Sequence, residues 1–181
     1  MLALLRNGLN ARPASTNTGG KEIADSQPIP FEPGQSAEDN IVVTEDLVNS
    51  FAEFSGDYNP LHTDTDFASK TEFVRKVAHG MSYGALFSRL IGMILPGPGA
   101  LWTSQSFRFK QPVFIGDRLT LRIVVTHVSQ STRSVTLDCT AINQGGSTVL
   151  TGTGEVMVLE REVVEEVPNQ PKQRVALIAG A

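Results

Sequence analysis

One short segment of the chain combines residue types that can move protons. It reads Ser-Gly-Asp-Tyr-Asn-Pro-Leu-His and runs from Ser55 to His62. An imidazole exchanges protons near neutral pH, and a carboxylate close to it can hold and polarise a water molecule. Because Pro60 restricts the backbone around it, the segment can direct Asp57 and His62 towards one point. These residues suggest general acid/base chemistry on water.

A purely structural interpretation of the same segment is equally open. Asp57 and Asn59 can hydrogen-bond the local backbone as in an Asx turn, and His62 can cap the next element. The two interpretations are compatible, because a stiff turn is a good mount for acid/base groups. The octapeptide alone does not decide between them.

The residues on either side predict short helices that flank this segment. Thr44 can be the N-cap of a helix that ends at Gly56, with acidic residues in its first turn. Apolar residues at helical spacing support this helix: Leu47, Val48, Phe51 and Phe54. A second short helix follows the segment and is capped by Thr63 or Asp64.

Residues 79–95 predict one long buried helix, because they are apolar nearly all round and Arg89 is their only charge. Small residues recur along one side of it: Gly80, Gly84, Ser88 and Gly92. The first N–H groups of a helix are unpaired, and Gly80 has no side chain to shield its own. A ligand carbonyl oxygen could therefore reach this N–H and form an oxyanion site.

The second half of the chain alternates apolar and polar residues over four long runs, which predicts an antiparallel β-meander. A further short strand is predicted at Asn40–Val43. A sheet that curls around one apolar helix buries the apolar surfaces of both. The expected fold class is therefore α+β, a hot-dog fold. One such unit leaves strand edges open, so we expect a homodimer with a continuous sheet.

Composition limits the function classes. The chain has 181 residues and a formal net charge of −4, which argues against a general nucleic-acid binder. It has no apolar run near the ~20 residues of a membrane helix, and no zinc-ligand spacing. The single cysteine, Cys139, excludes an internal disulfide and fits a reducing compartment. We expect a cytoplasmic protein; Arg6, Arg12 and the absence of acids before Glu22 leave the mitochondrial matrix as the alternative.

The domain organisation expected from the sequence has three parts. Residues 1–39 are a flexible extension with a short ordered piece around Ile29–Gln35, and residues 40–160 form the folded domain. Residues 161–181 are a linker and an apolar tail. The last eight residues, 174–181, look like the first strand of a short-chain dehydrogenase. The tail is therefore either a frayed end or the start of a missing second domain.

The segment resembles the signature of the MaoC-like hydratases, the R-specific enoyl-CoA hydratase group. That signature runs aromatic, spacer, aliphatic, small, Gly-Asp-x-Asn-Pro-aliphatic-His, and then a small residue. Matching residues in this chain are Phe51, Ser55, Gly56, Asp57, Asn59, Pro60, Leu61, His62 and Ala68. Phe54 stands where an aliphatic residue is usual. The similarity continues through Val-Ala-His-Gly-Met and Leu-Pro-Gly-Pro-Gly and covers about residues 40–160.

The resemblance implies reversible hydration of trans-2-enoyl thioesters, carried by CoA or acyl carrier protein, to (3R)-3-hydroxyacyl thioesters. It makes Asp57 and His62 the catalytic pair and the Gly80 N–H the oxyanion donor, with support from Asn59 and Ser88. It implies no cofactor and no metal. His79 and His127 have no match and are interpreted as structural. Arg108 and Lys110 either meet a carrier phosphate or form a solvated strand face.

Two other functions remain open at this point. A hot-dog thioesterase would hydrolyse the same substrates, commonly with one carboxylate and no paired histidine. A non-catalytic domain would bind acyl carriers or only dimerise. The presence of both Asp57 and His62 favours the hydratase over both alternatives.

Overall fold

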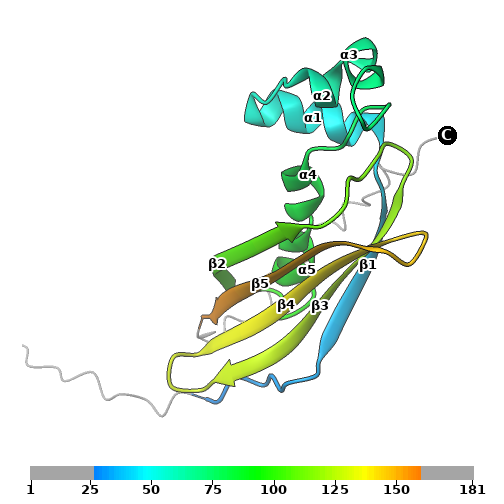
Figure 1. Ribbon diagram of the computed structural model, residues 1–181. Helices are drawn as coiled ribbons and strands as arrows, with labels where there is room; N and C mark the ends of the chain where they lie inside the picture. Colours follow the sequence, from blue (N-terminus) through cyan, green and yellow to red (C-terminus); the bar gives the residue numbers. More distant parts are fainter. Residues whose placement is uncertain (1–26, 160–181) are drawn as a thin grey trace, which may run out of the picture.

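The fold is built on a five-stranded antiparallel sheet. The structure, a computed structural model, describes residues 27–159; residues 1–26 and 160–181 lie outside the described residues. The strands are β1 (Ser36–Val42), β2 (Ala100–Phe109), β3 (Arg118–Ser129), β4 (Ser134–Asn143) and β5 (Thr148–Val158). The sheet curls around short helices on one side, which confirms the expected hot-dog arrangement (Figure 1).

The strand order differs from the predicted meander. Strands β3, β4 and β5 are consecutive neighbours, but the order across the sheet is β1-β3-β4-β5-β2. Strand β2 therefore pairs with β5, the last strand, and occupies an edge of the sheet. Alternation within one strand says which face is apolar and nothing about which neighbour it has, so this order could not be read from the pattern.

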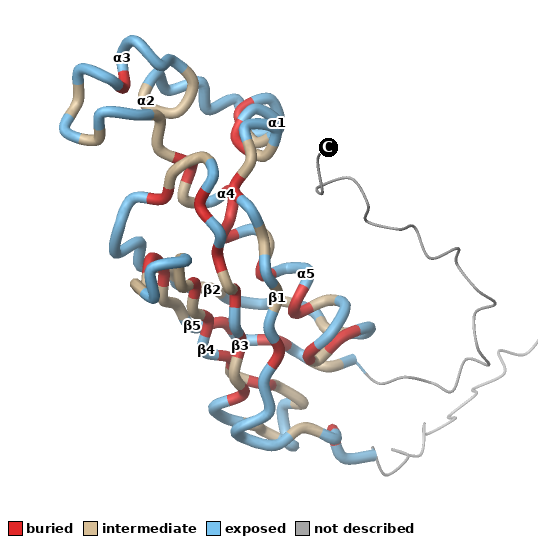
Figure 2. The backbone as a smooth tube through the Cα atoms, turned by 90° about the vertical axis from the view of Figure 1, so that its right-hand side faces the viewer, coloured by how far each residue is buried: buried red, intermediate tan, exposed pale blue. Residues whose placement is uncertain are grey.

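The helices fall into two groups. An overhang above the sheet consists of α1 (Glu45–Ser55), α2 (Pro60–Thr63) and α3 (Thr65–Ser69). Beneath it, α4 (Gly80–Gly84) and α5 (Phe87–Met93) follow each other along the sheet (Figure 1). Figure 2 shows that the buried backbone gathers along the sheet and these two helices, whereas most of the overhang is exposed.

Local capping forms the overhang as the sequence predicts. The Thr44 hydroxyl accepts a hydrogen bond from the Leu47 N–H, and Gly56 ends α1 with φ 75°, in the left-handed region that glycine favours. Asp64 caps α3 by accepting from the Phe67 N–H. The predicted apolar stripe of α1 is wrong at Phe54, whose side chain is 89% exposed, because the buried face runs through Val48 and Ala52 instead.

The long helix predicted at residues 79–95 is also wrong, because the structure divides it into α4 and α5. The N–H groups of Leu86, Ser88 and Arg89 donate three residues back, in place of the four-residue spacing of an α-helix. Gly84, a weak helix former, precedes this tightened turn. Burial is one-sided as well: Met81 and Met93 are at least half exposed, because the sheet covers one face only.

Two glycines of α4 allow close contact with β2. A Cβ on Gly84 would lie 3.2 Å from the Phe107 ring, and one on Gly80 would lie 2.8 Å from the Phe109 ring. A Cβ on Gly92 would meet nothing within 4 Å, and Ser88 is exposed. The predicted stripe of small residues is therefore used for packing at its first two positions.

The N-terminal boundary at residue 39 is wrong, because ordered structure begins earlier. Strand β1 starts at Ser36 and pairs along β3. Ile29 is buried, and its backbone exchanges two hydrogen bonds with the Gln130 side chain. These contacts are made by residues 76 to 101 positions away along the chain. They order β1 and the short piece around Ile29–Gln35 that the sequence predicted to be ordered. The predicted linker and tail, residues 161–181, lie outside the described residues.

The core lies between the helices and the concave face of the sheet. The face of β4 predicted to be apolar is buried as expected: Val135, Leu137, Cys139 and Ala141. Burial raises the pKa of the Cys139 thiol to about 11, so this cysteine stays protonated and unreactive at neutral pH. Within residues 27–159, none of the helices is long and apolar enough to cross a membrane.

Replacing a glycine of the central sheet tests this packing. A Cβ on Gly152 in β5 would lie 2.1 Å from the Ser106 carbonyl oxygen of β2, which is backbone that cannot move without breaking the pairing. We expect Gly152→Ala to lower the free energy of unfolding by about 2–3 kcal/mol, as overpacked cores do. Urea denaturation followed by circular dichroism measures the change.

Gly92→Ala is the matched control, because the new methyl group meets nothing within 4 Å. We expect it to be neutral or to stabilise α5 by up to about 1 kcal/mol. Equal stability of the two variants would contradict the described pairing of β2 with β5.

Candidate active site

A pocket of about 660 Å³ lies where the overhang meets α4. Four parts of the chain line it: the end of α1, the segment from Asp57 to His62, the stretch that enters α4, and the residues after β2. Of the predicted site residues, Asp57, His62 and Gly80 line this pocket. The structure therefore brings together the residues expected to carry the chemistry.

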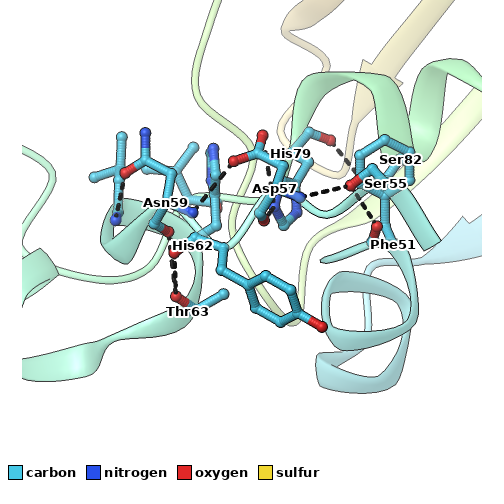
Figure 3. A network of polar contacts seen from close by, with 11 residues as sticks. Phe51, Ser55, Asp57, Asn59, His62, Thr63, His79 and Ser82 are labelled. Carbon is cyan, nitrogen blue, oxygen red and sulfur yellow. Dashed lines mark hydrogen bonds and ion pairs between the residues drawn. The ribbon is translucent and has the colours of Figure 1, made fainter. Parts of the chain in front are cut away.

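The Asp57 turn is held by hydrogen bonds within its own loop. The Asp57 N–H donates to the Ser55 hydroxyl at 3.2 Å, and the Asn59 N–H donates to Asp57 Oδ1 at 3.2 Å. Asn59 Oδ1 in turn accepts from the Leu61 N–H at 3.0 Å, which caps α2. The Asx-turn interpretation is thus correct, and it leaves Asp57 Oδ2 directed away from these bonds, on a side chain that is 51% exposed (Figure 3).

The ring of His62 has a defined tautomer. Its Nδ1 lies 2.6 Å from the Val77 carbonyl oxygen. A carbonyl oxygen only accepts hydrogen bonds, so Nδ1 carries the proton and donates it. The neutral ring then has its lone pair on Nε2. A histidine held in this way can accept a proton at Nε2 from a water in the pocket.

His79 is the site residue that sequence reasoning missed. Its side chain is 2% exposed, and its Nε2 lies 2.9 Å from the Asp57 carbonyl oxygen, to which it donates. Its ring centroid lies 4.0 Å from that of His62 (Figure 3). The available signal was its place directly before Gly80, at the start of a buried helix. His127, by contrast, is exposed on β3.

Within residues 27–159, Asp57, His62 and His79 form the group that could hold a metal ion, because one ligand atom of each lies within 4.8 Å of the others. The hydrogen bonds favour a different role. The His79 nitrogen closest to Asp57 Oδ2 is Nε2, at 4.0 Å, and this nitrogen carries the proton donated to the Asp57 carbonyl. Nε2 could bind a metal only by losing this proton and its hydrogen bond to the Asp57 carbonyl. In the arrangement described, His79 instead supports the segment that carries Asp57 and His62.

Gly80 begins α4, as predicted, and its N–H makes no hydrogen bond within the described part of the chain. Two details differ from the expectation. The space left by the missing side chain is taken by the Phe109 ring. In addition, α4 has only 5 residues, so its dipole is smaller than that of the long helix that was predicted.

The other predicted residues lie in four different places. Asn59 holds the turn without lining the pocket. Ser88 is exposed on α5 and is not among the lining residues, so a supporting role for it stays a prediction. Lys110 lines the pocket, whereas Arg108 lies on the opposite face of β2, in a separate hollow over β4 and β5.

The rest of the pocket wall is mainly apolar. Its aromatic and aliphatic members are Phe51, Phe73, Val77, Met81, Tyr83, Phe109 and Val113. Burial raises the pKa of the Tyr83 phenol to about 12, so this residue stays neutral across the physiological range. A chain of methylene groups would bury apolar surface here while a polar end reaches Asp57 and His62.

Proteins that are similar to this chain in sequence and in fold are named as (R)-specific hydratases. An (R)-specific enoyl-CoA hydratase of Aeromonas caviae is 43% identical over 109 residues, which are 60% of this chain and 81% of the relative. One of Rhodospirillum rubrum is 39% identical over 128 residues, 71% of this chain and 88% of the relative. The solved structure of the (R)-hydratase from A. caviae aligns with a TM-score of 0.70 and 39% identity, covering 72% of this chain and 98% of that one.

The model of one protein family, the MaoC-like domain, matches residues 28–144. This range includes strand β1 and the whole lining of the pocket. The match, the relatives and the arrangement of Asp57 and His62 agree, and the chain belongs to the MaoC-like domain family.

Proposed function

We propose that this protein is a hydro-lyase that reversibly hydrates trans-2-enoyl-CoA thioesters to (3R)-3-hydroxyacyl-CoA thioesters. One observation carries the proposal: His62 is held as the Nδ1–H tautomer beside Asp57, at the polar end of an apolar pocket. The names of the relatives in Aeromonas caviae and Rhodospirillum rubrum support the same reaction.

In this mechanism one water molecule lies between Asp57 Oδ2 and His62 Nε2. Nε2 takes a proton from the water as its oxygen bonds to C3 of the enoyl group, and the C2–C3 π electrons move towards the thioester carbonyl. The imidazolium then returns the proton to C2 on the same face, so that water has added across the double bond. Asp57 accepts a hydrogen bond from the remaining O–H and orients the oxygen.

The developing negative charge on the thioester oxygen needs a donor that is already in place. The Gly80 N–H has no hydrogen-bond partner among residues 27–159, lies at the start of α4, and belongs to a residue that lines the same pocket as Asp57 and His62. We assign it this role. Since α4 is short, the single N–H contributes more than the helix dipole does.

Replacing either member of the pair tests the site. A general acid or base typically accelerates a reaction ~10²–10⁴-fold. Asp57→Asn and His62→Ala should therefore each lower kcat for crotonyl-CoA hydration by a factor in this range. The melting temperature should change little. Loss of the enoyl-thioester absorbance measures hydration. Release of free thiol, followed in parallel, would identify a thioesterase instead.

Matched controls are available on the surface. Asp66 in α3 and His127 on β3 are exposed and lie outside the pocket lining, so Asp66→Asn and His127→Ala should keep the wild-type rate. Near wild-type turnover of both site variants would show that the assignment of the site is wrong.

We also propose a homodimer that continues the sheet through β2. This strand pairs on one side with β5 and is an edge of the sheet. Its Leu101 is 50% exposed, and Met157, opposite it on β5, is 40% exposed. The other edge, β1, instead places Glu38 and Asp39 in ion pairs with Arg122 and Arg89. Among the described residues β2 is the edge without ion pairs, and we infer that a second copy would cover it.

Charge placed on each edge distinguishes these possibilities. Leu101→Glu should raise the dissociation constant of the dimer at least tenfold, because a carboxylate would be desolvated at the β2 edge. Val42→Glu, on β1 and 41% exposed, is the matched control and should leave association unchanged. Sedimentation velocity from nanomolar to micromolar concentration measures both. A wild-type protein that is monomeric at micromolar concentration would contradict the proposal.

A further inference from the structure

Two segments distant in sequence meet at the site. The acid/base loop, residues 57–62, carries the catalytic pair, and the entry segment, residues 77–80, carries the Gly80 N–H. Three hydrogen bonds join them in the described chain: His62 Nδ1–H to the Val77 carbonyl at 2.6 Å, Val77 N–H to the Leu61 carbonyl at 3.2 Å, and His79 Nε2–H to the Asp57 carbonyl at 2.9 Å.

The three bonds are distributed unevenly along the acid/base loop. Two of them reach its end at Leu61 and His62, and only the bond from His79 reaches Asp57. The other hydrogen bonds of Asp57 go to Ser55 and Asn59, which belong to the same exposed turn. Without His79, the Asp57 end would therefore be held by its own neighbours alone.

The His79 ring is itself held firmly. It is 98% enclosed, with 2% of the side chain exposed, and lies between the rings of His62 at 4.0 Å and Phe51 at 5.1 Å. Its carbonyl oxygen accepts from both the Ser82 hydroxyl and the Ser82 N–H, which fixes the first turn of α4. One residue thus touches the catalytic carboxylate's backbone, the catalytic imidazole and the helix that presents the Gly80 N–H.

The second ring nitrogen shows that this arrangement has a cost. His79 Nδ1 is buried and has no hydrogen-bond partner, the one such side-chain atom among residues 27–159. Buried polar atoms normally have partners, and a buried polar atom without one destabilises the fold. A phenylalanine ring would fill the same space without this cost. What it would lack is the Nε2–H donor to Asp57.

We propose that His79 is a positioning residue that sets the distance between the acid/base pair and the oxyanion donor through its Nε2–H bond to the Asp57 carbonyl. This role rests on the proposed hydration reaction. Proton transfer to C2 and attack at C3 occur on a thioester whose carbonyl is bound at Gly80. The distance between the acid/base pair and the Gly80 N–H must therefore stay constant. A displacement of about 1 Å in such a geometry costs ~10²-fold in rate.

Two substitutions separate the donor from the ring. His79→Phe keeps a buried ring stacked on His62 and removes the donor. His79→Gln removes the ring and keeps an amide N–H near the position of Nε2. We expect kcat for crotonyl-CoA hydration to fall ~10²-fold in His79→Phe with KM nearly unchanged, since the lost contact acts on geometry rather than on substrate binding. The kcat of His79→Gln should be at least about tenfold higher than that of His79→Phe.

Two further measurements test the hydrogen bond from His79 to the Asp57 carbonyl and do not depend on enzymatic activity. Amide hydrogen exchange of residues 57–62 should accelerate in His79→Phe and stay near wild type in His79→Gln. In the wild-type protein, nitrogen-15 NMR of the side chains should show His79 protonated at Nε2 and His62 at Nδ1. This last measurement needs no variant, so it holds even where a substituted protein fails to fold.

The outcomes separate the two proposals. Wild-type kcat in His79→Phe, equal losses in the Phe and Gln variants, or a His79 ring protonated at Nδ1 would each overturn the positioning role. A wild-type protein that does not hydrate crotonyl-CoA would overturn the proposed function, while exchange and tautomer would still decide whether His79 holds the loop.

Discussion

The hydrogen bond from His62 Nδ1 to the Val77 carbonyl is the contact on which the chemistry of the site depends. It selects the tautomer that leaves Nε2 free, and it ties an exposed loop to a segment that belongs to the core. That segment is itself fixed, because the Ala78 N–H donates to the Val113 carbonyl at 2.7 Å and Val77 bridges to Phe114. The position of the imidazole is thereby fixed by the buried connection between β2 and β3 as well as by its own loop.

The overhang and the core are stabilised in different ways. The core buries a continuous set of aliphatic and aromatic side chains between sheet and helices. The three overhang helices bury only Val48, Ala52 and Ala68, and they owe their form to side-chain caps at Thr44, Asn59 and Asp64. Segments with few buried contacts open most easily. The candidate site therefore lies beside the part of the structure with the lowest free energy of local opening. This suits a site that admits and releases an acyl thioester, and a few hydrogen bonds join it to the core.

Close packing of glycine against aromatic rings links the pocket to the sheet. Phe107 and Phe109 occupy the space beside Gly84 and Gly80, and Phe109 is also part of the pocket wall. The same residues therefore set how near α4 lies to β2 and how much room an acyl chain has. Substitutions that enlarge Gly80 would act on both at once, because the added methyl group would displace the Phe109 ring.

Much of the local structure and half of the site follow from the sequence by itself. Caps and helical spacing define α1 and α3, period-two alternation defines the long strands, and the segment from Ser55 to His62 predicts the stiff turn that carries Asp57 and His62. Each of these depends on residues a few positions apart, where the backbone's own geometry decides. Tertiary structure alone decided the strand order and the pairing of Ser36–Val42 with β3. It also placed Ser88 outside the pocket lining and His79 in the site. His79 lies there through a hydrogen bond to Asp57, 22 positions away along the chain, and no local sequence pattern records such a contact.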